Sequence, residues 1–162
     1  MRHAVKVFFK GIILIIVLLI VFFSIGKINL IMGRSMVPNY LNGQECISFK
    51  IIYWFSQPRR GDVVIYKSLK NPEMDNIGRV IALPGERINI KDNQVYINDQ
   101  LLPEPYTSPN TITLPGSFND FIVDYDSYFI MGDNRILSDD SRHNGVSKFK
   151  DIKSKVFFKI GK

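Results

Sequence analysis

Four clusters of polar and glycine residues contain the types of residue that a site for acyl transfer needs. The first is the turn at residues 33–38, Gly-Arg-Ser-Met-Val-Pro, which contains Ser35. A serine at the end of a strand can attack a carbonyl carbon while backbone N–H groups stabilise the oxyanion that forms. Serines near glycine and proline are more often simple turn residues, so this turn alone does not define a site.

The other three clusters each have an ordinary structural interpretation when they are considered singly. Residues 60–66, Arg-Gly-Asp-Val-Val-Ile-Tyr, form a charged turn before an apolar strand, and residues 78–86 form a strand that a Pro-Gly turn closes. Residues 132–145 are dense in Gly, Asp, Asn, Arg and Ser, which is typical of a hydrogen-bonded loop. We expect Asp140 and Arg142 to form an ion pair within it.

An apolar segment precedes the serine turn, and a membrane span in this segment would place the turn close to the membrane surface. Sixteen residues without a charge, from Gly11 to Gly26, separate Lys10 from Lys27. As a helix they would cover about 24 Å, and apolar neighbours can extend the span while the flanking lysines reach the bilayer surface. The basic residues before the segment predict a cytosolic N-terminus and an exported C-terminal part.

The segment has a second interpretation, a cleaved signal peptide, because both begin with basic residues and continue with an apolar run. Ser24-Ile25-Gly26-Lys27 is a poor cleavage site, which favours an uncleaved anchor. The resulting division is a cytosolic tail at residues 1–10, a transmembrane anchor at 11–31 and an extracytoplasmic domain at 32–162. We therefore predict a single-pass protein of the cell membrane.

Composition limits the possible partners and cofactors. The formal net charge is +6, which anionic lipid headgroups explain better than nucleic acid does for an exported domain. Cys46 is the only cysteine, so no internal disulfide is possible, and we expect it to be buried. Two isolated histidines and one cysteine provide no ligand spacing for a metal, so we expect neither a metal nor a cofactor.

The exported domain has the pattern of a mainly β fold built from short antiparallel strands. Short β-branched segments alternate with turn residues, and two successive hairpins should turn at residues 92–93 and 98–100. Residues 103–117 contain four prolines and should form a surface loop, while only residues 148–152 could form a helical turn. The predicted strands are residues 45–49, 62–66, 78–82, 87–90, 94–97, 128–131 and 156–160.

Taken together and in this order, the four clusters resemble the type I signal peptidases, the serine endopeptidases that remove signal peptides from exported proteins. The matching motifs are Ser-Met-x-Pro, Arg-Gly-Asp-Val-Val, Arg-Val-Ile-x-Leu-Pro-Gly-Glu and Gly-Asp-Asn-Arg-x-x-Ser-x-Asp-Ser-Arg. The short chain without a large insertion is similar to the compact Gram-positive members. The resemblance implies the signal peptidase fold, preceded by one transmembrane helix.

The family uses a serine–lysine dyad, and by resemblance Ser35 is the nucleophile. An unprotonated lysine should take the serine proton, and it should stand immediately before Arg79, where this chain has Gly78. Ser138 matches the family serine that hydrogen-bonds this lysine, and Asp140 and Arg142 belong to the same supporting motif. The general base of the dyad is therefore missing.

Three explanations for the missing base remain open. Another residue could act as the base, and Lys67, Lys70 and His143 are the candidates along the chain. Alternatively, the substrate, a water or a partner completes the site, as in the non-standard relatives of Gram-positive pili that the chain resembles in lacking the lysine. The third explanation is a pseudoenzyme that binds without cutting, although the retained Ser35 and Ser138 weigh against it.

The resemblance also predicts how a substrate binds. Family members add an extended peptide to a strand edge and accept small side chains in shallow apolar pockets. The matching residues of this chain are Ile31, Met32, Gly33, Met36, Asp75 and Ile77. Gly33 stands where some relatives have a serine that helps to hold the oxyanion, which leaves that task to backbone N–H groups.

Together with the apolar segment, the resemblance implies a membrane-anchored, serine endopeptidase-like protein that acts on the signal peptides of exported or pilin precursors with reduced or non-standard catalysis. Its partners would be these precursors and the lipid bilayer, with no nucleic acid. The alternative is a non-catalytic assembly factor or chaperone for pilins or other surface proteins, which would need the peptide groove and not Ser35.

Overall fold

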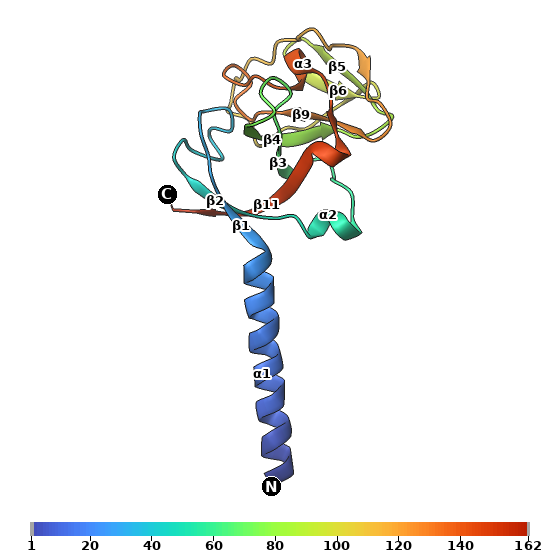
Figure 1. Ribbon diagram of the computed structural model, residues 1–162. Coiled ribbons are helices and arrows are strands. Elements are labelled where there is room, and N and C mark those ends of the chain that lie inside the picture. Colours follow the sequence, from blue (N-terminus) through green and yellow to red (C-terminus); the bar gives the residue numbers. More distant parts are fainter. Residues whose placement is uncertain (1, 162) are drawn as a thin grey trace.

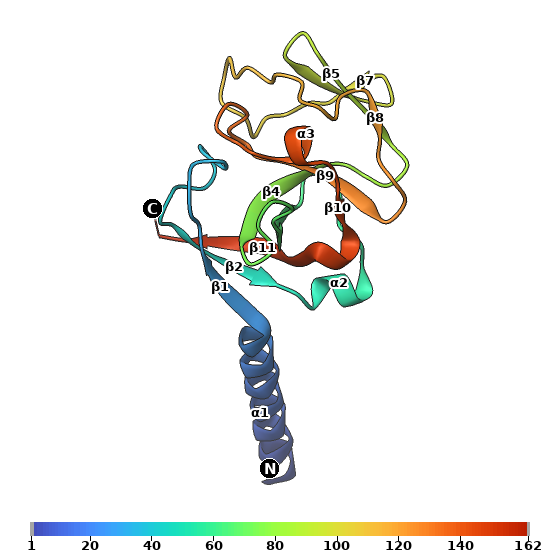
Figure 2. The same cartoon turned by 45° about the horizontal axis from the view of Figure 1, so that its top comes forward.

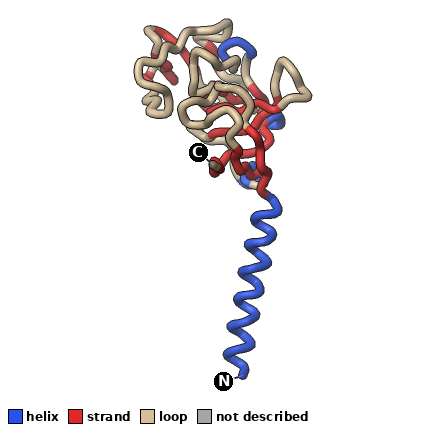
Figure 3. The backbone as a smooth tube through the Cα atoms, turned by 90° about the vertical axis from the view of Figure 1, so that its left-hand side faces the viewer, coloured by secondary structure: helices blue, strands red, loops and turns tan. Residues whose placement is uncertain are grey.

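A long N-terminal helix and a β domain make up the computed structural model, which describes residues 2–161, with side chains for residues 6–20 and 26–161. Helix α1 (Arg2–Ile25) extends away from the domain as a stalk (Figures 1 and 3). Its described side chains are solvent-exposed along residues 6–20. Within the described part of the chain, no helix is both long enough and apolar enough to qualify as a membrane span.

The stalk ends earlier than the sequence suggested. Residues Gly26–Leu30 form strand β1 of the domain, and Ile31 is buried in its core. The range predicted for the anchor, residues 11–31, therefore includes residues that form β1 in the structure. The physical reason is tertiary: Gly26–Leu30 pairs antiparallel with β2.

The larger part of the domain is a curled seven-stranded sheet with the strand order β1-β2-β11-β3-β4-β9-β10 (Figures 1 and 2). All its neighbouring strands pair antiparallel. After β1, its strands are β2 (Glu45–Phe49), β3 (Val63–Lys67), β4 (Asp75–Ala82), β9 (Ser127–Met131), β10 (Ser147–Lys148) and β11 (Ile152–Ile160).

A smaller four-stranded sheet with the order β7-β6-β5-β8 lies at the end of the molecule opposite α1 (Figure 2). The two predicted hairpins form its centre, and positive φ angles at Asp92, Asn93, Asn98 and Asp99 make their tight turns. Its strands are β5 (Arg87–Lys91), β6 (Gln94–Ile97), β7 (Gln100–Leu101) and β8 (Phe121–Ile122).

The structure confirms the mainly β prediction, with the seven predicted segments forming β2, β3, β4, β5, β6, β9 and β11. The sequence analysis missed β8 and β10, which have two residues each, and two short helices, α2 (Ile52–Phe55) and α3 (Ser141–Asn144). A 3₁₀ turn at Phe149–Asp151 lies where a helical turn was predicted. Residues 103–117 form an irregular connection, as predicted.

Three apolar clusters stabilise the domain and hold the strands that carry the candidate site. One lies between the two sheets around Phe129 and Met131, and a second packs Ile31 and Met36 against strand β3. A third contains Val64, Tyr66 and Ile130 on the opposite face of β3 and β4. Cys46 is fully buried in the second cluster, as predicted, and burial raises the pKa of its thiol.

Candidate functional site

The turn that carries Ser35 is attached directly to the loop after strand β9. The Ser35 carbonyl accepts a hydrogen bond from the Asn134 backbone N–H at 2.9 Å. A Cβ at Gly132 would collide with this carbonyl and with the Ser138 hydroxyl, so only glycine permits so close an approach. The two motifs that contain Ser35 and Ser138 are thus held against each other.

A buried polar network fixes the other end of the serine turn. Asn39 donates from its side-chain amide to the Asp133 carboxylate at 2.8 Å and to the Tyr106 carbonyl. Arg79 binds the same carboxylate through two nitrogens, at 2.8 and 2.7 Å, and stacks over the Tyr106 ring at 4.2 Å. Such bidentate pairs restrict geometry strongly, so the turn has little freedom to move relative to β4.

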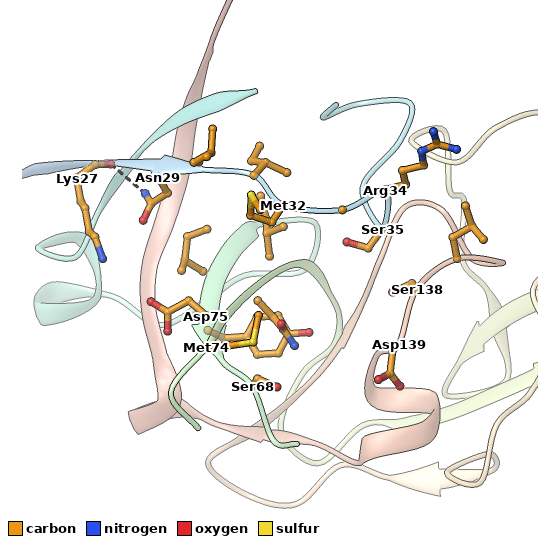
Figure 4. A pocket seen from close by; sticks show the side chains of 18 of the residues that line it. Lys27, Asn29, Met32, Arg34, Ser35, Ser68, Met74, Asp75, Ser138 and Asp139 are labelled. Carbon is orange, nitrogen blue, oxygen red and sulfur yellow. Dashed lines mark hydrogen bonds between the residues drawn. The ribbon is translucent and has the colours of Figure 1, made fainter. Parts of the chain in front are cut away.

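A groove of about 550 Å³ runs along β1 to the serine turn and brings most of the predicted site residues together. In Figure 4, Ser35 and Ser138 lie on separate segments at one end, while Asp75 and Met74 lie across the groove from the segment that carries Asn29 and Met32. The predicted residues that line it are Ile31, Met32, Gly33, Ser35, Asp75, Ile77 and Ser138. Met36 is instead buried beneath it, next to Ile31 in the core.

Two strand edges with unpaired backbone groups border this groove. Strand β1 is at the end of its sheet and pairs only with β2. Strand β4 pairs with β3 from Asp75 onward, but its pairing with β9 begins only at Arg79. Residues 75–78 therefore have one free edge, and an extended peptide could pair with β1 and β4 at once.

The space beside Gly78, where the family motif places its lysine, is filled by core side chains. A Cβ at Gly78 would lie 2.6 Å from Cγ2 of Ile130 and 3.2 Å from Cε1 of Tyr66. The Ile130 methyl group is attached to a branched Cβ and cannot swing away freely. Position 78 thus lacks a base and also lacks the room for one.

Tyr66 could be considered as a replacement base because its ring covers Gly78 and it lines the groove. Burial raises the pKa of its phenol far above the usual value, and the negative charge of Asp140 raises it further. A proton acceptor must be deprotonated to act, so this phenol cannot take the serine proton near neutral pH. Its position makes Tyr66 a filler of the lysine space.

The three replacement bases suggested by the sequence do not line the groove with Ser35. Lys70 is 62% exposed and forms an ion pair with Asp139 at 2.7 Å, whereas a basic lysine needs burial that disfavours its charge. His143 is exposed on α3, and Lys67 ends strand β3. Among the described residues, no side chain forms a hydrogen bond with the Ser35 hydroxyl.

Ser138, Asp140 and Arg142 have a structural task that the missing lysine does not affect. The Gly132 N–H donates to the Ser138 hydroxyl and to the Asp140 carboxylate, both at 3.1 Å. The predicted ion pair between Asp140 and Arg142 is confirmed, with a distance of 2.8 Å and both side chains almost fully buried. Retention of these residues is therefore explained by support of the loop next to Ser35.

Sequence reasoning missed the residues that fill or brace the site. Asn39 directly follows the serine motif, and Tyr66 is the last residue but one of strand β3, but neither position draws attention by its type. Ile130 was assigned to a strand only. The strand alternation offered a signal, because Val64 pairs with Gly78, and Ile130 pairs with Val80, which lies on the same face of β4 as Gly78. Among the described residues, no cluster suited to a metal ion occurs.

Comparison with known proteins places these observations in a family context. A sequence profile described as signal peptidase, peptidase S26, matches residues 1–160. Signal peptidase I U of Bacillus subtilis is 35% identical over 143 residues, which cover 82% of this chain and 75% of that protein. Signal peptidase I T of the same organism is 36% identical over 124 residues, which cover 72% of this chain and 63% of that protein.

A solved structure is similar as well. The crystal structure of a signal peptidase I from Enterococcus faecalis superposes with a TM-score of 0.56 at 29% sequence identity. The match covers 63% of this chain and 98% of that chain.

Proposed function

Because this chain belongs to the signal peptidase family, peptidase S26, we propose that its groove binds the cleavage region of signal peptides and that Ser35 cuts them only slowly. Family membership supports signal-peptide cleavage by a serine peptidase. The observation that carries the finer proposal is the contrast at the groove, where two strand edges are free but the lysine space is filled.

The groove suits an extended peptide with small side chains at alternate positions. Backbone pairing with β1 and β4 would supply affinity without regard to side chains, and the apolar side chains of Ile31 and Ile77 would admit only small residues beside Ser35. Ser35 would attack the scissile carbonyl, and backbone N–H groups, chiefly that of Ser35, would stabilise the oxyanion. The serine proton would pass to water or to a partner.

We further propose that α1 attaches the protein to the cell membrane with the domain outside. Its apolar side chains are exposed along one continuous helix, and a charge-free run separates Lys10 from Lys27. Ser35 follows Gly26 by nine positions, which the extended chain can span over roughly 30 Å at most. Ser35 would therefore work close to the bilayer, where signal peptides emerge.

The test compares binding and cleavage in the same preparation. Wild type and Ser35→Ala in lipid are titrated calorimetrically with a peptide that carries alanines at alternate positions, and cleavage is followed by mass spectrometry. We expect both proteins to bind equally and only wild type to cut, with a deficit of about 10² to 10⁴-fold against a family member that has the lysine. Rapid cleavage by wild type would contradict the proposal.

The second candidate function is a non-catalytic assembly factor for pilins or other surface proteins. The filled space beside Gly78 favours it, because core packing there leaves no route to a lysine-assisted reaction. The two candidates differ in their need for Ser35. If a chromosomal Ser35→Ala variant still assembles surface proteins normally, the binding function accounts for the biological role.

A further inference from the structure

Arg34 stands directly before Ser35 and carries a charge that the rest of the site does not neutralise. Its side chain is exposed and lines the end of the groove. Among the described residues, none forms an ion pair, a side-chain hydrogen bond or an aromatic contact with its guanidinium. The charge is therefore free to bind an anionic group that comes from outside the chain.

The serine turn holds the backbone of Arg34 in one place. Gly33 has a φ angle of +93°, a left-handed conformation that bends the chain between β1 and Ser35. The Gly33 N–H donates to the side-chain oxygen of Asn42 at 2.7 Å, and the Ser35 carbonyl accepts from the Asn134 N–H at 2.9 Å. Because the backbone is fixed on both sides of Arg34, binding of a ligand would order only its own side chain.

The acidic residues that line the groove are already paired with lysines. Asp75 binds Lys153 at 2.5 Å, and Asp139 binds Lys70 at 2.7 Å. The opposite wall and the serine turn, residues 26–44, contain two basic residues and no acidic residue. One wall of the groove thus has an uncompensated positive charge, which complements an acidic substrate.

Arg34 lies on the side of Ser35 where the leaving part of a substrate would pass. In Figure 4, its side chain lies beyond Ser35, away from Met32 and Asp75. The groove that we propose for the residues before the scissile bond ends at Ser35, so the residues after this bond would continue towards Arg34. An extended peptide advances by about 3.3 Å per residue, which keeps the first two of them within roughly 7 Å of Ser35. The long arginine side chain can reach both positions.

We propose that Arg34 selects precursors that carry aspartate or glutamate at the first or second position after the scissile bond. A guanidinium binds a carboxylate through two parallel hydrogen bonds, which a neutral amide side chain cannot match. The inference rests on the proposed function of the groove and names the substrate class that this site prefers. Arg34 is a specificity-determining residue with no part in proton transfer, because its guanidinium stays protonated.

The test measures peptide affinity in the Ser35→Ala background, which cannot cut. The full-length protein in a neutral detergent is titrated calorimetrically with peptides that carry alanines at alternate positions before the cleavage point. The peptides differ only in having Glu at the first position after this point, Glu at the second, or Gln at both. We expect at least one Glu peptide to bind about three- to fivefold more tightly than the Gln peptide at low ionic strength. Added salt should reduce this preference.

Two substitutions and a matched control assign the preference to one side chain. Arg34→Gln should remove the preference and leave the affinity for the Gln peptide unchanged. Arg34→Glu should reverse it, so that a peptide with Lys in place of Glu binds more tightly, which a merely damaged fold would not produce. The control is Arg59→Gln, which removes an exposed arginine outside the groove and should keep the preference for Glu.

The other outcomes overturn the inference in distinguishable ways. Equal affinity for all peptides in the Ser35→Ala background would overturn it and leave the proposed function of the groove intact. A preference for Glu that survives Arg34→Gln would belong to another cation. A preference that exists in detergent but not in vesicles with phosphatidylglycerol would show that Arg34 binds lipid headgroups and not substrate. If none of the peptides binds, the proposed function is contradicted as well.

Discussion

On one side of Ser35, β1 and β4 leave strand edges unpaired, whereas on the other side Ile130 and Tyr66 fill the space beside Gly78. The first side depends on backbone geometry, which many sequences can maintain. The second side depends on the residue at position 78, because a glycine there lets Ile130 and Tyr66 pack into the space that a larger side chain would need. The strand edges beside Ser35 are thus open although Gly78 has no side chain that could act as a base.

The largest expected effect comes from restoring the base together with the room for it. In Gly78→Lys alone, Cβ meets the Ile130 methyl group, and such overpacking costs about 1–3 kcal/mol of stability. In Gly78→Lys/Ile130→Met, the branched carbon is gone and an unbranched side chain of similar size remains. We expect peptide cleavage in lipid to rise by about 10² to 10⁴-fold over wild type.

The matched control for this pair is Gly78→Ala/Ile130→Met, which adds the Cβ and relieves the same contact without an amine. Its cleavage rate should equal that of wild type. An equal gain in both double variants would show that repacking and not a base causes the effect. If Gly78→Lys alone gave the full gain in cleavage rate, the packing of Ile130 beside Gly78 would not be what prevents a lysine from acting there.

A second prediction removes the support that both sides share. Asp140→Ala leaves the buried Arg142 guanidinium without its carboxylate and removes one of the two acceptors of the Gly132 N–H, so the free energy of unfolding should fall by about 3–5 kcal/mol. The neighbouring Asp139→Ala removes an exposed ion pair and should cost less than about 1 kcal/mol. Urea unfolding in detergent compares them, and similar losses would contradict a special role for the buried pair.

A third prediction affects the binding side alone. Ile77→Arg places a charge against the apolar wall of the groove and should weaken peptide binding by about 1–3 kcal/mol. Ile122→Arg, at an exposed position of the far sheet, is the control and should bind like wild type. Circular dichroism checks that both variants fold, and unchanged affinity of a folded Ile77→Arg would place the peptide elsewhere.

The sequence predicted the strands that carry strong local signals. Segments such as Glu45–Phe49 and Gln94–Ile97 alternate and end at turn residues, so their bounds agree with the structure. Strand β1 was missed because its residues continue an apolar run, and only the tertiary pairing of Gly26–Leu30 with β2 separates it from the helix. Local pattern cannot distinguish these alternatives at a junction.

The candidate site was predictable as a set of motifs, but its internal packing was not. Ser35, Ile77 and Ser138 belong to separate stretches of the sequence. They line one groove because distant strands of the sheet pair with one another. That Ile130 closes the space beside Gly78 depends on the register of β4 against β9, in which Ile130 pairs with Val80. Such a register is a property of the whole sheet, so a sequence that shows a missing lysine does not show what replaced it.

The smallest expected effect concerns the rim of the groove, where Lys70 donates to Asp139. This hydrogen bond lowers the pKa of the Asp139 carboxyl below its usual value. Because the folded-state pKa is depressed, the pair stabilises the fold above the unfolded-state pKa near 3.8, and this contribution is lost as the pH falls through the folded-state value.

In Lys70→Met, the Asp139 pKa should return towards normal, as carboxyl chemical shifts in an NMR titration would record. Cleavage at neutral pH should stay unchanged, because an exposed lysine in an ion pair is not the base that Ser35 lacks. A loss of cleavage in Lys70→Met with an unaltered Asp139 pKa would instead make Lys70 the proton acceptor. The side of the groove next to Gly78 would then contribute a base to the reaction although Ile130 and Tyr66 fill the space there.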